Sequence, residues 1–126
     1  LESIGGIYSD MDIELISPFV HQLNKNKIYI IGASSGDEFV QNSLMISPPS
    51  DFWKGFLKES RENIINNFNQ VNSYPNLKET VGPIALSKYV KKNISQVEIL
   101  PANLFNQSTG ICFTKHHQTG IWGFVN

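Results

Sequence analysis

Short hydrophobic runs separated by turn residues predict a series of β-strands along the chain. The run Ile28–Gly32 is the clearest, because an unbroken series of β-branched and aromatic residues favours a buried strand. Shorter runs predict further strands at Gly6–Ser9, Ile13–Ile16, Asn42–Ser47, Val97–Pro101 and Ile111–Thr114.

Two longer stretches have the pattern of helices. Charged residues alternate with an apolar stripe over Asp51–Asn69, and Ser50 or Asp51 supplies an N-cap. The stripe consists of Phe52, Phe56, Ile64 and Phe68. A loop at Asn72–Lys78 leads to a second helix that begins at Pro83, a residue suited to the first helical position, and runs to about Lys92. Helices and strands together predict an α/β fold with a small, mostly buried sheet.

Composition narrows the class of protein. The 126 residues carry a net charge of -1, with 40% hydrophobic and 17% charged residues, which fits one globular domain with a single core. This balance gives no electrostatic footprint for nucleic acid or an anionic membrane. The single cysteine, Cys112, excludes an internal disulfide and a cysteine-rich zinc site. No apolar run approaches the roughly 20 residues of a membrane helix, so this segment does not encode membrane association.

The first residues resemble the end of a secondary-structure element. Leu1–Ile4 has the pattern of the last turn of a helix, and Gly5 occupies the usual C-terminal position. We therefore expect the 126 residues to be part of a longer chain.

The most informative chemistry is a pair of carboxylates directly after the first predicted strand. Residues i and i+2 of a strand point to the same side, so Asp10 and Asp12 can converge on one point. Two carboxylates favour a hard cation, Mg²⁺ or Mn²⁺, which commonly binds substrate phosphates. Gly5 and Gly6 allow a ligand to approach the backbone closely. The alternative is a solvated Asp-x-Asp turn, which is common in proteins.

The stretch from Leu1 to Glu14, with GGIYSDMDIE at its centre, resembles the sugar-binding segment of the DXD-containing glycosyltransferases. That family includes outer-chain mannosyltransferases, inositol-phosphoceramide mannosyltransferases and capsular-polysaccharide transferases. The resemblance implies a GT-A-type fold, a nucleotide-sugar donor and a divalent metal. It also implies that the present chain, 1–126, is the C-terminal part of one catalytic domain. The N-terminal half, which holds much of the nucleotide pocket in the family, would then precede it.

Two further segments match this family in order. Asn42 corresponds to an asparagine that lines the donor and acceptor cleft, and its carboxamide can both donate to and accept from sugar hydroxyls. Thr80-Val81-Gly82-Pro83 resembles a Thr-Gly-Pro block at a helix N-terminus, where free N–H groups suit a diphosphate. The alternatives are an asparagine at a strand entry and a plain helix start.

The last matching segment is His116-His117-Gln118-Thr119-Gly120-Ile121-Trp122, which resembles the family's His-His-x-x-Gly-Ser-Trp block. Ile121 stands where the family has serine. An imidazole can serve as a ligand of Mn²⁺. Neighbouring residues of a strand face opposite sides, so only one histidine should face the ion. We favour His117, which shares its side with Thr119 and Ile121. The alternative is a pair of half-exposed polar residues.

The sequence therefore predicts a metal-dependent glycosyltransferase of the retaining type that uses Mn²⁺ or Mg²⁺. Its partners would be a nucleotide-sugar donor and a carbohydrate or glycolipid acceptor, with no nucleic acid. The alternative is a non-catalytic carbohydrate- or cation-binding module. We name no catalytic residue. The expected metal ligands are Asp10, Asp12 and His117, and the expected donor-binding residues are Gly6, Tyr8, Asp10, Asn42, Gly82 and Trp122.

The compartment stays open. The resemblance would place the protein in the cytoplasm of a bacterial or virus-infected cell, or in the Golgi lumen of a eukaryote. The glycosylation sequons at Asn93 and Asn106 do not decide between these, because such matches are frequent by chance in an Asn-rich chain.

Overall fold

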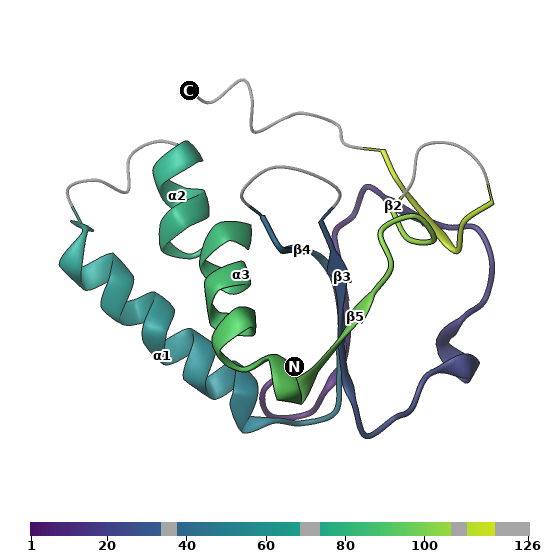
Figure 1. Ribbon diagram of the computed structural model, residues 1–126, viewed down its shortest axis with the longest axis horizontal. Coiled ribbons are helices and arrows are strands. Elements are labelled where there is room, and N and C mark those ends of the chain that lie inside the picture. Colours follow the sequence, from purple (N-terminus) through teal and green to yellow (C-terminus); the bar gives the residue numbers. More distant parts are fainter. Residues whose placement is uncertain (34–37, 69–73, 107–110, 118–126) are drawn as a thin grey trace.

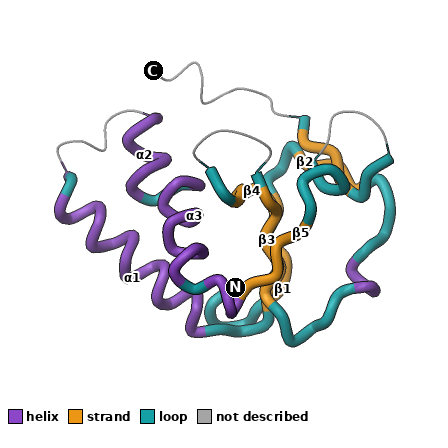
Figure 2. Tube along the Cα trace, viewed as in Figure 1, coloured by secondary structure: helices purple, strands orange, loops and turns teal. Residues whose placement is uncertain are grey.

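A computed structural model of the chain describes residues 1–33, 38–68, 74–106 and 111–117. Within these residues the protein is a mixed α/β domain with helices on one face of a four-stranded sheet and a small two-stranded sheet beside it (Figures 1 and 2). The strands are β1 (Gly6–Ser9), β2 (Ile13–Leu15), β3 (Ile28–Gly32), β4 (Val40–Ser47), β5 (Val97–Leu100) and β6 (Thr114–His116). The α-helices are α1 (Asp51–Asn66), α2 (Tyr74–Thr80) and α3 (Pro83–Lys92), with 3₁₀ turns at Val20–Gln22 and Ile94–Gln96.

The main sheet has the strand order β1-β4-β3-β5 and is mixed. β4 is antiparallel to both of its neighbours, and β5 is parallel to β3. Since parallel strands need a crossover connection, α1, α2 and α3 lie between β4 and β5 in the sequence and cover one face (Figure 1). β2 and β6 pair antiparallel in the second sheet.

The apolar run Ile28–Gly32 forms β3, in the interior of the main sheet, and the prediction of a buried strand is confirmed. Ile28 and Ile30 pack into a core with Phe52, Trp53, Leu86 and Val90 of the helices. Ile31 belongs to a second core with Phe19, Leu44, Leu100 and Phe105. Both faces of β3 are therefore covered, which explains why its sequence does not alternate between apolar and polar residues.

The first long helix begins as predicted, but its apolar stripe is only partly buried. Ser50 is the N-cap, and its Oγ accepts a hydrogen bond from the Phe52 N–H at 3.2 Å. Phe52 and Trp53 are buried, whereas Ile64 is 38% and Phe68 76% exposed. Figure 1 shows why: α1 diverges from the sheet after its first turns. The apolar positions of its second half therefore have no sheet to pack against.

Two predicted elements differ from the structure. Where a loop was expected up to Lys78, residues Tyr74–Thr80 form α2, which ends as the N–H groups of Val81 and Gly82 both donate to the Leu77 carbonyl. The last strand is Thr114–His116 rather than Ile111–Thr114, because pairing with β2 sets its position. Ile111 itself is 96% exposed.

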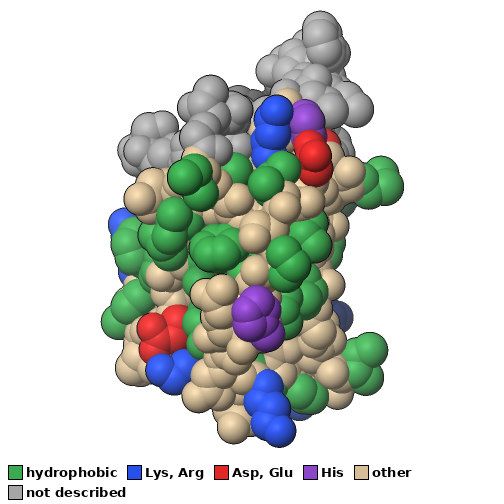
Figure 3. All heavy atoms as spheres, turned by 90° about the vertical axis from the view of Figure 1, so that its right-hand side faces the viewer, with side chains coloured by type: hydrophobic (Ala, Val, Ile, Leu, Met, Phe, Trp, Pro, Cys, Tyr) green, Lys and Arg blue, Asp and Glu red, His purple; other side chains and the backbone are tan. Residues whose placement is uncertain are grey.

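None of the described helices is long and apolar enough to cross a membrane. Hydrophobic side chains show over much of the side of the molecule that carries β2 and the segment after it (Figure 3). In these segments Leu15, Ile16 and Val20 are exposed. Acidic, basic and histidine side chains gather at the top of the same view. Further charged side chains lie in the lower part of the same view, so this face carries charge at both ends.

Replacing Ser87 by alanine should destabilise the fold. The buried Ser87 hydroxyl joins α3 to β4, because its Oγ accepts hydrogen bonds from the N–H groups of Phe39 (2.9 Å) and Val40 (3.0 Å). Leaving such groups unpaired costs about 1–3 kcal/mol. Chemical denaturation of Ser87→Ala should show this loss, while Ser95→Ala, at an exposed serine, should unfold like the wild type. Equal unfolding curves for the two variants would contradict the assigned role.

Candidate metal centre

The two carboxylates that follow β1 are brought together by a turn. The Asp10 N–H donates to the Ser43 carbonyl of β4 at 2.8 Å, and the Asp10 carbonyl accepts from the Ile13 N–H at 3.3 Å. The chain thus leaves the main sheet at Asp10 and enters β2 at Ile13. Met11, between the two carboxylates, is fully exposed. The expected convergence of Asp10 and Asp12 is present, but a turn produces it rather than strand alternation.

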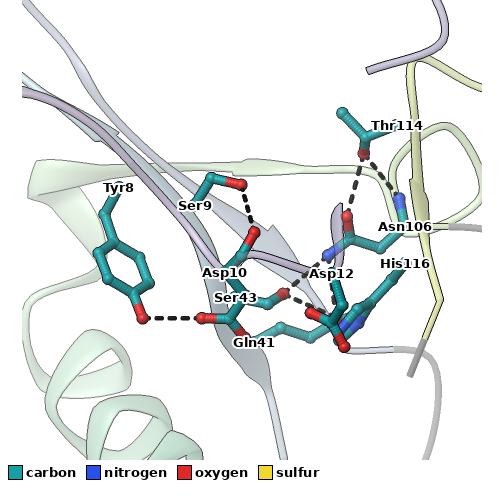
Figure 4. Close-up of polar contacts among 9 residues, drawn as sticks. All are labelled: Tyr8, Ser9, Asp10, Asp12, Gln41, Ser43, Asn106, Thr114 and His116. Carbon is teal, nitrogen blue, oxygen red and sulfur yellow. Dashed lines mark hydrogen bonds and ion pairs between the residues drawn. The ribbon is translucent and has the colours of Figure 1, made fainter. Parts of the chain in front are cut away.

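The C-terminal strand adds an imidazole to this pair. β6 pairs with β2 so that His116 lies opposite Ile13, and the His117 N–H donates to the Asp12 carbonyl at 2.9 Å. His116 Nε2 lies 3.2 Å from Asp12 Oδ1 (Figure 4). Asp10, Asp12 and His116 each offer a ligand atom, and these atoms all lie within 4.8 Å of one another. We call these three residues the Asp-Asp-His cluster.

The imidazole beside the two carboxylates is that of His116, whereas the sequence predicts His117. The His117 ring lies 2.9 Å from Glu14 Oε2, and both side chains are about half exposed, at 46% and 54%. Strand alternation does separate the two histidines, but His116 shares its side with the buried Thr114. Asp12 lies in the turn before β2, so strand alternation does not set the direction of its side chain, and its carboxylate reaches His116. The sequence-based choice of His117 relied on the side that it shares with Thr119 and Ile121, and that side does not show which histidine Asp12 contacts.

The cluster fits a divalent cation in spacing and in chemistry. Two ligands at about 2.1 Å from one ion lie at most about 4.2 Å apart. The three ligand atoms lie within 4.8 Å of one another, which is somewhat above that limit, so side-chain movements would be needed to bring them onto one ion. Two carboxylates and one imidazole suit Mn²⁺, and suit Mg²⁺ less well. His116 Nδ1 is buried and has no hydrogen-bond partner in the described part of the chain, so Asp12 is the contact that orients this ring.

Tyr8 connects the cluster to the face of the sheet that the helices cover. Its hydroxyl donates a hydrogen bond to Asp10 Oδ1 at 2.7 Å (Figure 4). This hydrogen bond, together with partial burial and the charge of Asp10, raises the pKa of the Tyr8 hydroxyl above its ordinary value. The hydroxyl is therefore protonated at neutral pH and holds one oxygen of the Asp10 carboxylate in place.

A groove of about 590 Å³ begins at Tyr8 and continues between β1 and the helices. Three of the expected donor-binding residues line it, namely Tyr8, Asn42 and Gly82. Most of its remaining wall is apolar and includes Ile7, Met45, Trp53, Phe56 and Leu86. We call it the Tyr8 groove. A pocket with apolar walls and few polar groups is the usual form of a small-molecule site.

The other expected donor-binding residues are placed differently. Gly6 is not in the groove wall; it starts β1 with a φ of 115°, which L side chains rarely adopt. Gly82 has a packing role as well, since a Cβ there would lie 2.8 Å from the Lys78 Cα. Asp10 belongs to the Asp-Asp-His cluster. Trp122 lies outside the described residues.

An irregular stretch of β4 separates the groove from the cluster. Ile30 pairs with Met45 but Gly32 pairs with Val40, so two steps along β3 match five along β4. Such irregularities re-aim side chains and are frequent near functional sites. Asn42 lines the groove. Its neighbours Gln41 and Ser43 instead contact Asn106 (Figure 4).

Asn106 is a buried polar residue next to the cluster, which the sequence marks only as part of a glycosylation sequon. It has a φ of 59°, and its carboxamide Nδ2 donates to Ser43 Oγ at 2.8 Å. This nitrogen is engaged inside the fold, so the sequon at Asn106 does not mark an accessible glycosylation site in the folded chain. The one available signal was weak: asparagine tolerates a left-handed backbone better than most residues.

Comparisons with protein-family models, with curated proteins and with solved structures find no match to this chain. The geometry of the cluster and the groove therefore carries the functional argument.

Exchanging the histidines one at a time should identify the metal ligand. His116→Ala removes a cluster ligand and should raise the dissociation constant for Mn²⁺ by at least about tenfold, the scale at which even outer-shell partners act. His117→Ala removes only the exposed contact to Glu14 and is the matched control, with little expected change. Calorimetric titration measures both. A larger effect at His117 would restore the original assignment.

Proposed function

We propose that this chain contributes the metal-binding and sugar-binding part of a GT-A-type glycosyltransferase. The reaction would move a sugar from a nucleoside-diphosphate donor to an acceptor hydroxyl. The observation that carries the proposal is the position of the Asp-Asp-His cluster beside the Tyr8 groove, with Tyr8 in contact with both. The resemblance of GGIYSDMDIE to the DXD-containing glycosyltransferases supports the same reading.

The three cluster residues would hold Mn²⁺ or Mg²⁺ by two carboxylates and one imidazole. A bound divalent ion supplies neutralisation of the donor diphosphate and Lewis-acid assistance to the departing nucleoside diphosphate. Tyr8 orients the Asp10 carboxylate through its 2.7 Å hydrogen bond. Such preorganisation matters because ligands already in place need no rearrangement when charge develops.

The Tyr8 groove would hold the sugar part of the donor. Asn42 is exposed at its edge, and its carboxamide can pair with sugar hydroxyls as donor and acceptor. Gly82 is the N-cap of α3, so the positive end of the helix dipole lies at the groove wall. Ile7, Phe56 and Leu57 supply accessible apolar surface against which a ring could pack.

No described carboxylate is assigned as a nucleophile. Glu14, the nearest glutamate in sequence, contacts His117 rather than the cluster, and Glu38 pairs with Lys78. The retaining outcome therefore rests on the family resemblance alone. The same observation favours the second candidate, a carbohydrate- or cation-binding module without catalysis, because a cation site and a groove would suffice for binding.

Coupling between metal and nucleotide separates the two candidates. A transferase should bind Mn²⁺ more tightly in the presence of a nucleoside diphosphate, since the diphosphate supplies further oxygen ligands to the ion. Titration of the full-length protein with Mn²⁺, with and without UDP or GDP, measures this coupling. Nucleoside monophosphates are the matched control. Identical Mn²⁺ affinities under all conditions would favour the non-catalytic module.

Loss of a cluster carboxylate should abolish most sugar transfer. Asp10→Ala in the full-length protein removes a ligand and should lower turnover by on the order of 10²–10³, as loss of a single stabilising group does elsewhere. Glu14→Ala removes a carboxylate close in sequence but outside the cluster, and should retain turnover. Sugar transfer at saturating donor is the measurement. Unchanged turnover in Asp10→Ala would end the assignment.

A further inference from the structure

We propose that Asn106 is a positioning residue that holds the two halves of the metal centre in register. The inference rests on the proposed metal site, and it assigns a role to a residue that touches none of the expected ligands. Asn106 joins the strand that fixes Asp10 to the strand that carries His116.

The Asp-Asp-His cluster is assembled from two separate sheets. Asp10 is attached to the main sheet, because its N–H donates to the Ser43 carbonyl of β4. Asp12 directly precedes β2 and His116 ends β6, and among the described residues these two strands pair only with each other. A cation bound by all three residues would therefore span the boundary between the sheets, and its affinity depends on how well that boundary is fixed.

Asn106 bridges this boundary with both ends of its carboxamide. Toward β4, Nδ2 donates to Ser43 Oγ at 2.8 Å and to Gln41 Oε1 at 3.3 Å. Toward β6, Oδ1 accepts from Thr114 Oγ1 at 3.0 Å, and the Asn106 N–H donates to the same Thr114 oxygen at 2.9 Å. We call these four residues the seam network (Figure 4).

The network is buried, which makes its hydrogen bonds costly to lose. Ser43, Asn106 and Thr114 are 4%, 8% and 2% exposed. A buried polar group without its partner costs the full desolvation penalty, so breaking one contact disturbs the others. Gln41 extends the network into the main sheet, since its Nε2 donates to the Gly32 carbonyl at 3.1 Å.

The chemistry of this position calls for asparagine. The φ of 59° lies in the left-handed region, which few residues other than glycine and asparagine adopt readily. Glycine would fit the backbone but would lack the carboxamide. Aspartate would keep the size and the acceptor oxygen but would lose the Nδ2 donor that reaches Ser43.

The network acts on the cluster through the backbone. Thr114 and His116 are two residues apart on β6 and share one side of the strand, so fixing Thr114 fixes the direction of the His116 ring. Ser43 uses its hydroxyl to hold Asn106 and its carbonyl to hold the Asp10 N–H. Asn106 thus sets the distance between ligands on the two sheets without contacting them.

Variants at Asn106 in the full-length protein test this role. Asn106→Gly keeps the backbone conformation and removes the bridge, while Asn106→Asp keeps the shape and removes the donor. Both should raise the dissociation constant for Mn²⁺ by on the order of tenfold, the lower end of the effect of outer-shell partners. Ile28→Val, in the core at the far end of β3, is the control for general destabilisation and should leave Mn²⁺ affinity unchanged.

Amide hydrogen exchange without metal provides a second readout. In Asn106→Gly the amides of Asp10 and His117 should exchange faster relative to the amide of Ile30, whereas Ile28→Val should not change that ratio. Wild-type Mn²⁺ affinity in both Asn106 variants would overturn the positioning role and leave the metal site standing. Absence of Mn²⁺ binding by the wild-type protein would overturn the proposed metal site and this inference with it.

Discussion

The pairing of β2 with β6 is the interaction on which the candidate site depends. It brings a strand from the end of the described chain back to the turn that follows β1, and so places His116 beside Asp12. Without it, Asp10 and Asp12 would be two carboxylates in an exposed turn, with too few ligands to distinguish a cation site from solvated surface. The second sheet is small, with three residues in each strand, so contacts to the main sheet must help to hold it.

Tyr8 and β4 each contribute both to the polar cluster or its supporting network and to the apolar groove. Tyr8 lines the groove, yet its hydroxyl reaches Asp10. Alternation along β4 places Asn42 in the groove wall and its neighbours Gln41 and Ser43 in the seam network. A regular strand in uniform register with β3 would not supply the extra β4 residues of this stretch. The residues that serve the groove and the network lie within this irregularly paired stretch of β4.

Much of the fold was predictable because local sequence decides it. The apolar run of β3, the serine N-cap of α1 and the Gly82-Pro83 start of α3 each carry their own signal and were predicted correctly. Apart from α2, which forms where a loop was expected, the failures involve tertiary context. The second half of α1 has a helical apolar stripe but diverges from the sheet, and the position of β6 follows from its pairing with β2.

The candidate site was predictable in part, for the same reason. Asp10 and Asp12 could be selected from their spacing, because residues so close in sequence are close in space. The choice between His116 and His117 could not, since it depends on the side chain of a turn residue across a strand pair. Asn106 gave almost no signal: its contacts to Ser43 and Thr114 follow from how two sheets meet, which neither periodicity nor composition records.

The seam network and a bound ion would both stabilise the arrangement in which the ligands on the two sheets lie close together. An ion at a free concentration of 100 times its dissociation constant would stabilise this arrangement by about 2.7 kcal/mol. Buried hydrogen bonds contribute about 0.5–1.5 kcal/mol each, so two or three of them across the seam are of the same size. Because coupling is reciprocal, each stabilises the other by the same amount. In a chain that lacked the network, part of the free energy of ion binding would be used to bring the ligands of the two sheets together. The affinity for the ion would therefore be weaker. With a preformed seam, the binding free energy of the proposed ion would remain available for binding a diphosphate.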